Sequence, residues 1–208
     1  MLRTSAGDVS PPISPANAGT SWVDETRKLD ISVYAAIAAT PTPTLDVAFR
    51  RLSRAADHSK LWLGAATAMF RLGGSHGRRA AANGLASVAL TSAVVNLLLK
   101  PLAGRRRPSR DTYGVPVTRE VAMPHSTSWP SGHAASAFAF ATAAGAASPR
   151  TAAPLTALAA LVAYSRVHTG VHYPLDVIAG AVAGVATAPV ATAAARRLHP
   201  WDLDELRR

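Results

Sequence analysis

Residues 130–149 read PSGHAASAFAFATAAGAASP, and this stretch decides the fold class. It contains no Asp, Glu, Lys or Arg, and alanine, the strongest helix former, fills nearly half of it. A helix that crosses a bilayer needs roughly 20 consecutive residues of this kind. The stretch therefore predicts a membrane-spanning helix with a Pro-Ser-Gly-His motif, residues 130–133, at its N-terminal end. A water-soluble, alanine-rich helical bundle is the alternative.

Three more uncharged runs cover residues 80–99, 151–165 and 177–195. With the first stretch they predict four helices, over residues 79–101, 132–148, 151–166 and 174–197. Residues 61–72 form a shorter fifth candidate, whose flanking basic side chains can extend to the membrane interface. We therefore expect an all-α fold: an integral membrane helical bundle with about five transmembrane helices.

The N-terminal part of the chain has a different pattern. Residues 1–28 are polar, contain prolines and lack apolar periodicity, so we expect a flexible tail there. Residues 45–56 alternate apolar with basic positions, which predicts an amphipathic helix at the membrane interface. Residues 29–208 then form one membrane domain. Its last helix carries Gly180 and Gly184, a small-xxx-small face suited to close helix packing within one protomer or, alternatively, to a dimer contact.

The composition limits the class of partner. The net charge is +10, from 22 Lys and Arg against 12 Asp and Glu, which suits anionic lipid headgroups or a phosphorylated substrate. Nucleic acid is a poor fit, because aromatic residues are few and long apolar runs separate the arginines. The chain has no cysteine, which excludes disulfides, thiolate metal sites and cysteine nucleophiles.

Three polar clusters lie between the apolar runs. They read KPLAGRRRP at 100–108, PSGH at 130–133 and SRVHTGVHYPLD at 165–176. If each intervening helix crosses the bilayer once, all three clusters come to the same side. Cations, two imidazoles, a carboxylate and a helix N-terminus then converge, and a phosphate site uses groups of these kinds.

The clusters together resemble the three-part signature of the type 2 phosphatidic acid phosphatase superfamily. The matching residues follow the spacing Lys100-x6-Arg107-Pro108, then residues 130–133, then Ser165-Arg166-x5-His172-x3-Asp176. The resemblance covers about residues 29–200. The superfamily includes lipid phosphate phosphatases, undecaprenyl-diphosphate phosphatases and vanadium haloperoxidases. Many of its membrane members have six spans, and the usual first span is not evident before Leu29.

The resemblance implies a role for each matching residue. His172 would attack phosphorus to form a phosphohistidine, and Asp176 would fix the tautomer of its imidazole. His133 would be the general acid that protonates the leaving oxygen. The phosphoryl oxygens would be bound by Lys100, Arg107, Ser131, Gly132 and Arg166. No metal and no other cofactor is implied, because the cations are side chains and the clusters hold a single carboxylate.

The remaining polar residues of the clusters receive structural or surface roles. His168 occupies a variable position of the third cluster, and we expect it to be structural or solvated. Arg105, Arg106 and Arg110 lie outside the signature positions, and we expect them to attract lipid headgroups.

The expected function is therefore a metal-independent phosphatase that removes a terminal phosphate from a membrane lipid. Phosphatidate, phosphatidylglycerol phosphate, a polyprenyl diphosphate and a polyprenyl-linked sugar phosphate are all open as substrates. The alternatives are a non-catalytic membrane protein that binds lipid phosphates and a vanadate-dependent haloperoxidase, which the spans and the small size disfavour. We expect a multi-pass protein of the cell membrane. Basic residues at the opposite end, such as Arg78 and Arg150, place that end in the cytoplasm and the active site outside.

Overall fold

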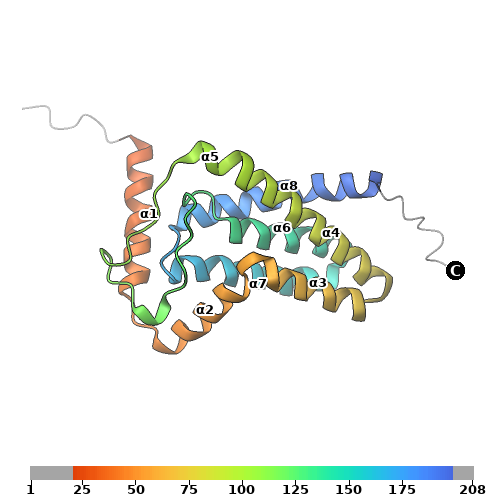
Figure 1. The fold of residues 1–208 in the computed structure, drawn as a ribbon, viewed down its shortest axis with the longest axis horizontal. Coiled ribbons are helices and arrows are strands. Elements are labelled where there is room, and N and C mark those ends of the chain that lie inside the picture. Colours follow the sequence, from red (N-terminus) through yellow and green to blue (C-terminus); the bar gives the residue numbers. More distant parts are fainter. Residues whose placement is uncertain (1–20, 199–208) are drawn as a thin grey trace, which may run out of the picture.

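The computed structural model describes residues 21–198, and all regular elements in this range are helices (Figure 1). The all-α prediction is confirmed. The helices are α1 (Trp22–Ala39), α2 (Pro43–Ala55), α3 (Lys60–Leu72), α4 (Gly74–Ala93), α5 (Lys100–Ala103), α6 (Gly132–Ala147), α7 (Pro149–His168) and α8 (Pro174–Leu198). A π-helical turn, Val94–Leu99, joins α4 to α5, and short 3-10 turns form at Asp57–Ser59 and Val117–Arg119.

The expected helices agree with the observed ones to within a few residues, except at two N-terminal ends. Helix α4 begins at Gly74, ahead of the expected start at residue 79. Helix α1 begins at Trp22, inside the expected flexible tail of residues 1–28. Asp24 and Glu25 in its first turn favour a helix start there, because acidic side chains interact well with a helix N-terminus. Residues 1–20 lie outside the described part.

Helix α6 lies at the centre of the bundle, packed against α4, α7 and α8. Its side chains are mostly small and apolar on every side, which suits a helix that is surrounded by others. Helix α8 crosses it closely at Gly180 and Gly184. A Cβ atom at these positions would lie 2.3 Å from the carbonyl oxygen of Ser131 and 2.2 Å from that of Ala135. The glycine pair is therefore used for packing inside the chain.

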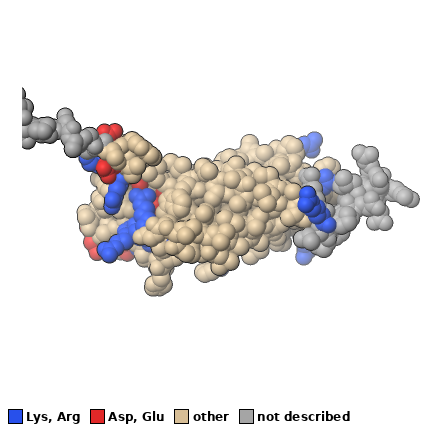
Figure 2. All heavy atoms as spheres, turned by 90° about the horizontal axis from the view of Figure 1, so that it is seen from above, with Lys and Arg blue, Asp and Glu red and all other residues tan. Residues whose placement is uncertain are grey.

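Charged side chains occupy the ends of the molecule. On the face shown in Figure 2, Lys and Arg gather at the end where α1 lies and at the opposite end, with a long uncharged surface between them. Among the described residues, two segments are long and apolar enough to cross a bilayer: Gly74–Ala103 with a mean hydropathy of 1.6, and Pro174–Ala195 with 1.8. These features indicate a membrane protein.

Helices α1 and α2 lie at the end of the bundle that carries the three polar clusters (Figure 1). The turn between them is held by the buried guanidinium of Arg119, whose Nε lies 2.8 Å from Asp46 Oδ1 and whose Nη2 lies 2.5 Å from the carbonyl oxygen of Thr40. His168 Nε2 is 3.0 Å from the same Asp46 oxygen, and the His168 side chain is buried. His168 is therefore a packing residue that ties α7 to α2.

Candidate active site

The three polar clusters meet at one end of the bundle, between the end of α5, the start of α6 and the turn from α7 to α8. Arg107 Nη1 donates to the carbonyl oxygen of Val171 at 2.8 Å and lies 3.2 Å from His172 Nε2. The Ser131 N–H donates to the carbonyl oxygen of Asp176 at 2.8 Å, which joins the second cluster to the third. Segments far apart in the sequence thus form one site.

His172 is buried, and its contacts define its protonation. A guanidinium has no acceptor, so the contact with Arg107 requires an unprotonated Nε2 and places the proton of a neutral ring on Nδ1. Burial, together with the charges of Arg107 and Arg166, lowers the pKa of His172 to about 3, although the hydrogen bond to Asp176 acts in the opposite direction. The ring is therefore neutral at pH 7, with its Nε2 lone pair directed toward Arg107.

Asp176 lies behind the Nδ1 side of His172. Its Oδ2 is 3.5 Å from Nδ1, which is long for a direct hydrogen bond. The Ser128 hydroxyl lies 2.5 Å from the same Oδ2 and 3.4 Å from Nδ1, and the Tyr173 N–H also donates to Oδ2, at 2.9 Å. Arg105, which we expected at the lipid headgroups, instead donates to Asp176 Oδ1 at 2.7 Å. The carboxylate is thus fixed by several partners at once.

His133 is paired with a second carboxylate, that of Asp57. Its Nε2 lies 2.9 Å from Asp57 Oδ1, and Arg166 Nη1 lies 3.7 Å from the same oxygen. Asp57 comes from the turn between α2 and α3, where His58 and Ser59 both adopt left-handed conformations with φ of 55° and 59°. Such residues are uncommon and mark local strain, often at functional sites. The hydrogen bond from His133 holds the pKa of the Asp57 carboxyl below its usual value.

The expected phosphate-binding groups surround the two histidines. Arg166 is buried, its Nη1 donates to the Ser53 hydroxyl, and its Nε has no hydrogen-bond partner within residues 21–198. Lys100 Nζ lies 3.1 Å from Ser126 Oγ, and a Cβ atom on Gly132 would stand 3.8 Å from that Nζ. Ser131 is buried and caps α6, with its side-chain oxygen accepting from the N–H of Ala134.

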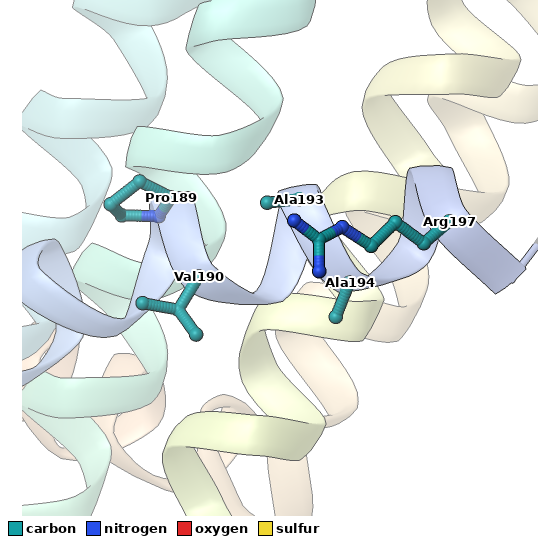
Figure 3. A pocket seen from close by; sticks show the side chains of 5 residues that line it. All are labelled: Pro189, Val190, Ala193, Ala194 and Arg197. Atoms are coloured by element: carbon teal, nitrogen blue, oxygen red, sulfur yellow. The ribbon is translucent and has the colours of Figure 1, made fainter.

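A polar cavity of about 240 Å³ opens beside this site. Three of the expected site residues line it: Lys100, Gly132 and His133. The other lining residues are Ala56, His58, Ser59, Ser92, Asn96 and Ser136. A larger hollow of about 520 Å³ lies at the other end of α8, along Pro189, Val190, Ala193, Ala194 and Arg197 (Figure 3). The larger hollow contains none of the expected site residues, whereas Lys100, Gly132 and His133 line the smaller, polar cavity.

The carboxylates of the site lie apart from one another in ion pairs: Asp176 with Arg105, and Asp57 with His133 and Arg166. Within residues 21–198, no group of three or more His, Asp and Glu side chains is arranged to hold a metal ion. Among the described residues, the cations whose charges act on His133 or His172 are Lys100, Arg107 and Arg166.

The comparison with known proteins agrees with the motifs. The family model described as the PAP2 superfamily matches residues 80–200, more than half of the chain. The chain belongs to the PAP2 superfamily. The resemblance drawn from the three clusters is thereby confirmed.

Two solved structures share the fold of this PAP2 protein. The crystal structure of LpxE from Aquifex aeolicus superposes with a TM-score of 0.65 at 26% identity, covering 78% of this chain and 94% of that one. The transmembrane PAP2-type phosphatidylglycerolphosphate phosphatase of Bacillus subtilis superposes with a TM-score of 0.62 at 20% identity, covering 86% and 90%. At 20% identity the likeness concerns the fold alone. No curated protein matches the chain in sequence.

The structure adds residues that the sequence did not single out. Ser128 lies just before the second cluster and had no assigned role, whereas Arg105 lies inside the first cluster and was assigned to lipid headgroups. Asp57 is 76 positions from His133, and its own stretch contains no motif. Only the packing of the turn between α2 and α3 onto the start of α6 brings Asp57 to the site.

Proposed function

We propose that this PAP2 protein is a multi-pass membrane phosphatase that removes a terminal phosphate from a lipid. One observation carries the proposal: Arg107 and Arg166 act on the neutral, buried imidazole of His172, and the Arg166 Nε–H is buried without an acceptor within the described residues. Lys100 adds a third cation beside His133. A buried donor without a partner costs free energy, which a bound phosphoryl oxygen would offset. The site thus favours an anion with several oxygens.

In the first chemical step, His172 Nε2 attacks phosphorus and forms an N–P bond. The bond from phosphorus to the leaving oxygen breaks, and His133 gives that oxygen its proton. Asp176 and Ser128 hold the Nδ1 side of the ring and stabilise the positive charge that develops on the imidazole. Asp57 stabilises the protonated form of His133 before the transfer.

In the second step, a water molecule attacks the phosphohistidine. The now neutral His133 takes a proton from this water, the N–P bond breaks, and inorganic phosphate leaves. Arg107, Lys100 and Arg166 bind the equatorial oxygens in both steps, so the charge of the transition state is stabilised by side chains already in place. No step needs a metal ion.

The proposed membrane placement follows the length of the helices. Five spans are assigned to α3, the α4–α5 segment, α6, α7 and α8, with α1 and α2 at the interface beside the site. Helix α3 has 13 residues and is therefore about 20 Å long, shorter than a hydrocarbon core of about 30 Å. Lys60 and Arg71 at its ends can extend to the interface. The positive-inside rule assigns the site to the non-cytoplasmic face.

A phosphate-release assay in detergent with EDTA tests the proposal. The substrates are phosphatidate, phosphatidylglycerol phosphate, a polyprenyl diphosphate and a polyprenyl-linked sugar phosphate. We expect release from at least one of them, and its complete loss in His172→Ala. The matched control is His76→Ala, since His76 is exposed at the opposite end of the bundle and should keep wild-type activity.

Two results would reject the proposal. The first is failure of the wild-type protein to release phosphate from every substrate. The second is a His172→Ala variant that still releases phosphate, because the nucleophile would then be another group. Protein quenched in alkaline detergent after reaction with radioactively labelled substrate should show an acid-labile, base-stable adduct in the wild type only.

A further inference from the structure

Arg105 lies between two buried carboxylates from opposite ends of the chain. Its Nη1 donates to Asp176 Oδ1 at 2.7 Å, and its Nη2 donates to Asp30 Oδ2 at 2.5 Å. The side chains of both aspartates are fully buried, while that of Arg105 is 25% exposed. The guanidinium also stacks over Tyr173, with 4.4 Å from its carbon to the ring centroid. Each carboxylate therefore receives a fixed, charge-assisted hydrogen bond.

The second oxygen of Asp30 is used as well. Asp30 Oδ1 accepts from the N–H of Leu175 at 2.8 Å, in the first turn of α8. The first N–H groups of a helix have no partner within it, and a negative charge there is favourable. Asp30 thus binds the start of the helix that carries Asp176. It also belongs to α1, whose other buried residues are Tyr34 and Ala38.

The charges of this group act on His172. Arg105 alone would neutralise Asp176 and weaken its attraction for a positive imidazole. Asp30 shares the guanidinium and leaves the group of two aspartates and one arginine with a net negative charge. That charge favours the cationic ring which forms when His172 Nε2 binds phosphorus. The contacts also hold Asp176 in one orientation.

We propose that Asp30 is a positioning residue for the nucleophile, acting through Arg105 on Asp176 and His172. The proposal rests on the phosphatase function proposed above. Asp30 itself touches no substrate, so its removal should lower the rate of phosphohistidine formation and leave KM unchanged. A residue that only anchors α1 would affect folding without this selective change.

The test compares Asp30→Asn with Asp24→Asn in the full-length protein in detergent. Asparagine keeps the size of Asp30 but removes its charge, and Asp24 is an exposed aspartate on the same helix. We expect Asp30→Asn to slow phosphohistidine formation about tenfold or more, as expected for loss of a charge-assisted hydrogen bond, with unchanged KM. Asp24→Asn should behave as the wild type. A wild-type rate in Asp30→Asn would overturn the proposal.

A second variant covers the case in which Asp30→Asn does not fold. Arg105→Lys replaces the planar fork with a single amine, which cannot hold both aspartates in the same geometry. We expect the same loss of rate at unchanged KM, and a wild-type rate would again overturn the proposal.

A measurement that needs no substrate turnover distinguishes failure of this inference from failure of the proposed function. In protein labelled with nitrogen-15 histidine, the ring signals of His172, assigned with His172→Gln, should shift in Asp30→Asn and stay in place in Asp24→Asn. Unchanged His172 signals in Asp30→Asn refute the link from Asp30 to the imidazole, whatever the activity. If the His172 signals shift in Asp30→Asn but the wild-type protein forms no phosphohistidine, the phosphatase function is rejected and the link from Asp30 to the imidazole is kept.

Discussion

Replacing Asp57 by asparagine separates the two chemical roles proposed for the histidines. The change removes a negative charge that lies 2.9 Å from His133 Nε2 and 3.7 Å from Arg166 Nη1, and it keeps the shape of the side chain. A smaller fraction of the molecules then carries a proton on His133, so fewer of them can act by general acid catalysis. We expect kcat to fall for substrates whose leaving group is a lipid alkoxide, because this oxygen needs a proton as it departs.

The structure sets the size of the effect. Two unit charges at about 4 Å interact by about 1 kcal/mol in water and by about 4 kcal/mol near a protein surface. The Asp57 side chain is 34% exposed, so solvent screens part of this attraction. Hydrogen bonds to charged groups contribute about 1.5–3 kcal/mol, which lies inside these limits. The expected loss in kcat is therefore about 10- to 150-fold.

The assay compares a lipid phosphate with p-nitrophenyl phosphate in the same detergent. The nitrophenolate ion leaves without a proton, so the Asp57→Asn variant should lose less than about threefold on this substrate. KM should stay the same or fall, because Arg166 no longer has Asp57 as a competing partner for phosphate. Asp111→Asn, an exposed aspartate in the loop after α5, is the matched control. Equal losses on both substrates, or no loss on the lipid, would refute the role of Asp57.

Three further results are expected. Phosphate release should survive EDTA and be inhibited by vanadate, which mimics five-coordinate phosphorus; loss of activity on chelation that magnesium restores would contradict the mechanism. The chain has no cysteine, so single cysteines can report the topology: Ala122→Cys, at the end that carries the site, should react with an impermeant thiol reagent on intact cells, and His76→Cys, at the opposite end, should not. The reverse pattern would place the site in the cytoplasm. Because the pKa of folded His172 is about 3, below the ordinary value of about 6.5, the unfolded chain binds more protons between these two values. The stability that neutral His172 contributes is thus full above about pH 6.5 and is lost as the pH falls toward 3. The thermal midpoint in detergent should therefore fall less with acid in His172→Gln than in the wild type. Parallel curves for the two proteins would contradict the lowered pKa of His172.

The helices could be predicted because their signals are local. Residues 134–147 are uncharged and rich in alanine, and a window of this length is enough to indicate a helix and to exclude a solvent-exposed one. The same holds for the spacing of Lys100 and Arg107, or of His172 and Asp176, where a fixed number of residues along a short segment sets the distance. The start of α1 at Trp22 was missed because its polar sequence shows no apolar periodicity.

The sequence alone thus determined the helical class, the family and the residues that belong to each motif. The tertiary structure decided which other charges reach those residues. Asp57 and His133 are 76 positions apart, and Arg105 lies 75 positions from Asp30 and 71 from Asp176. The spacing within a motif carries no information on such pairs, because each depends on how whole helices pack. The burial that lowers the pKa of His172 likewise arises only when the segments that carry Arg107, Ser128 and Asp176 pack around it.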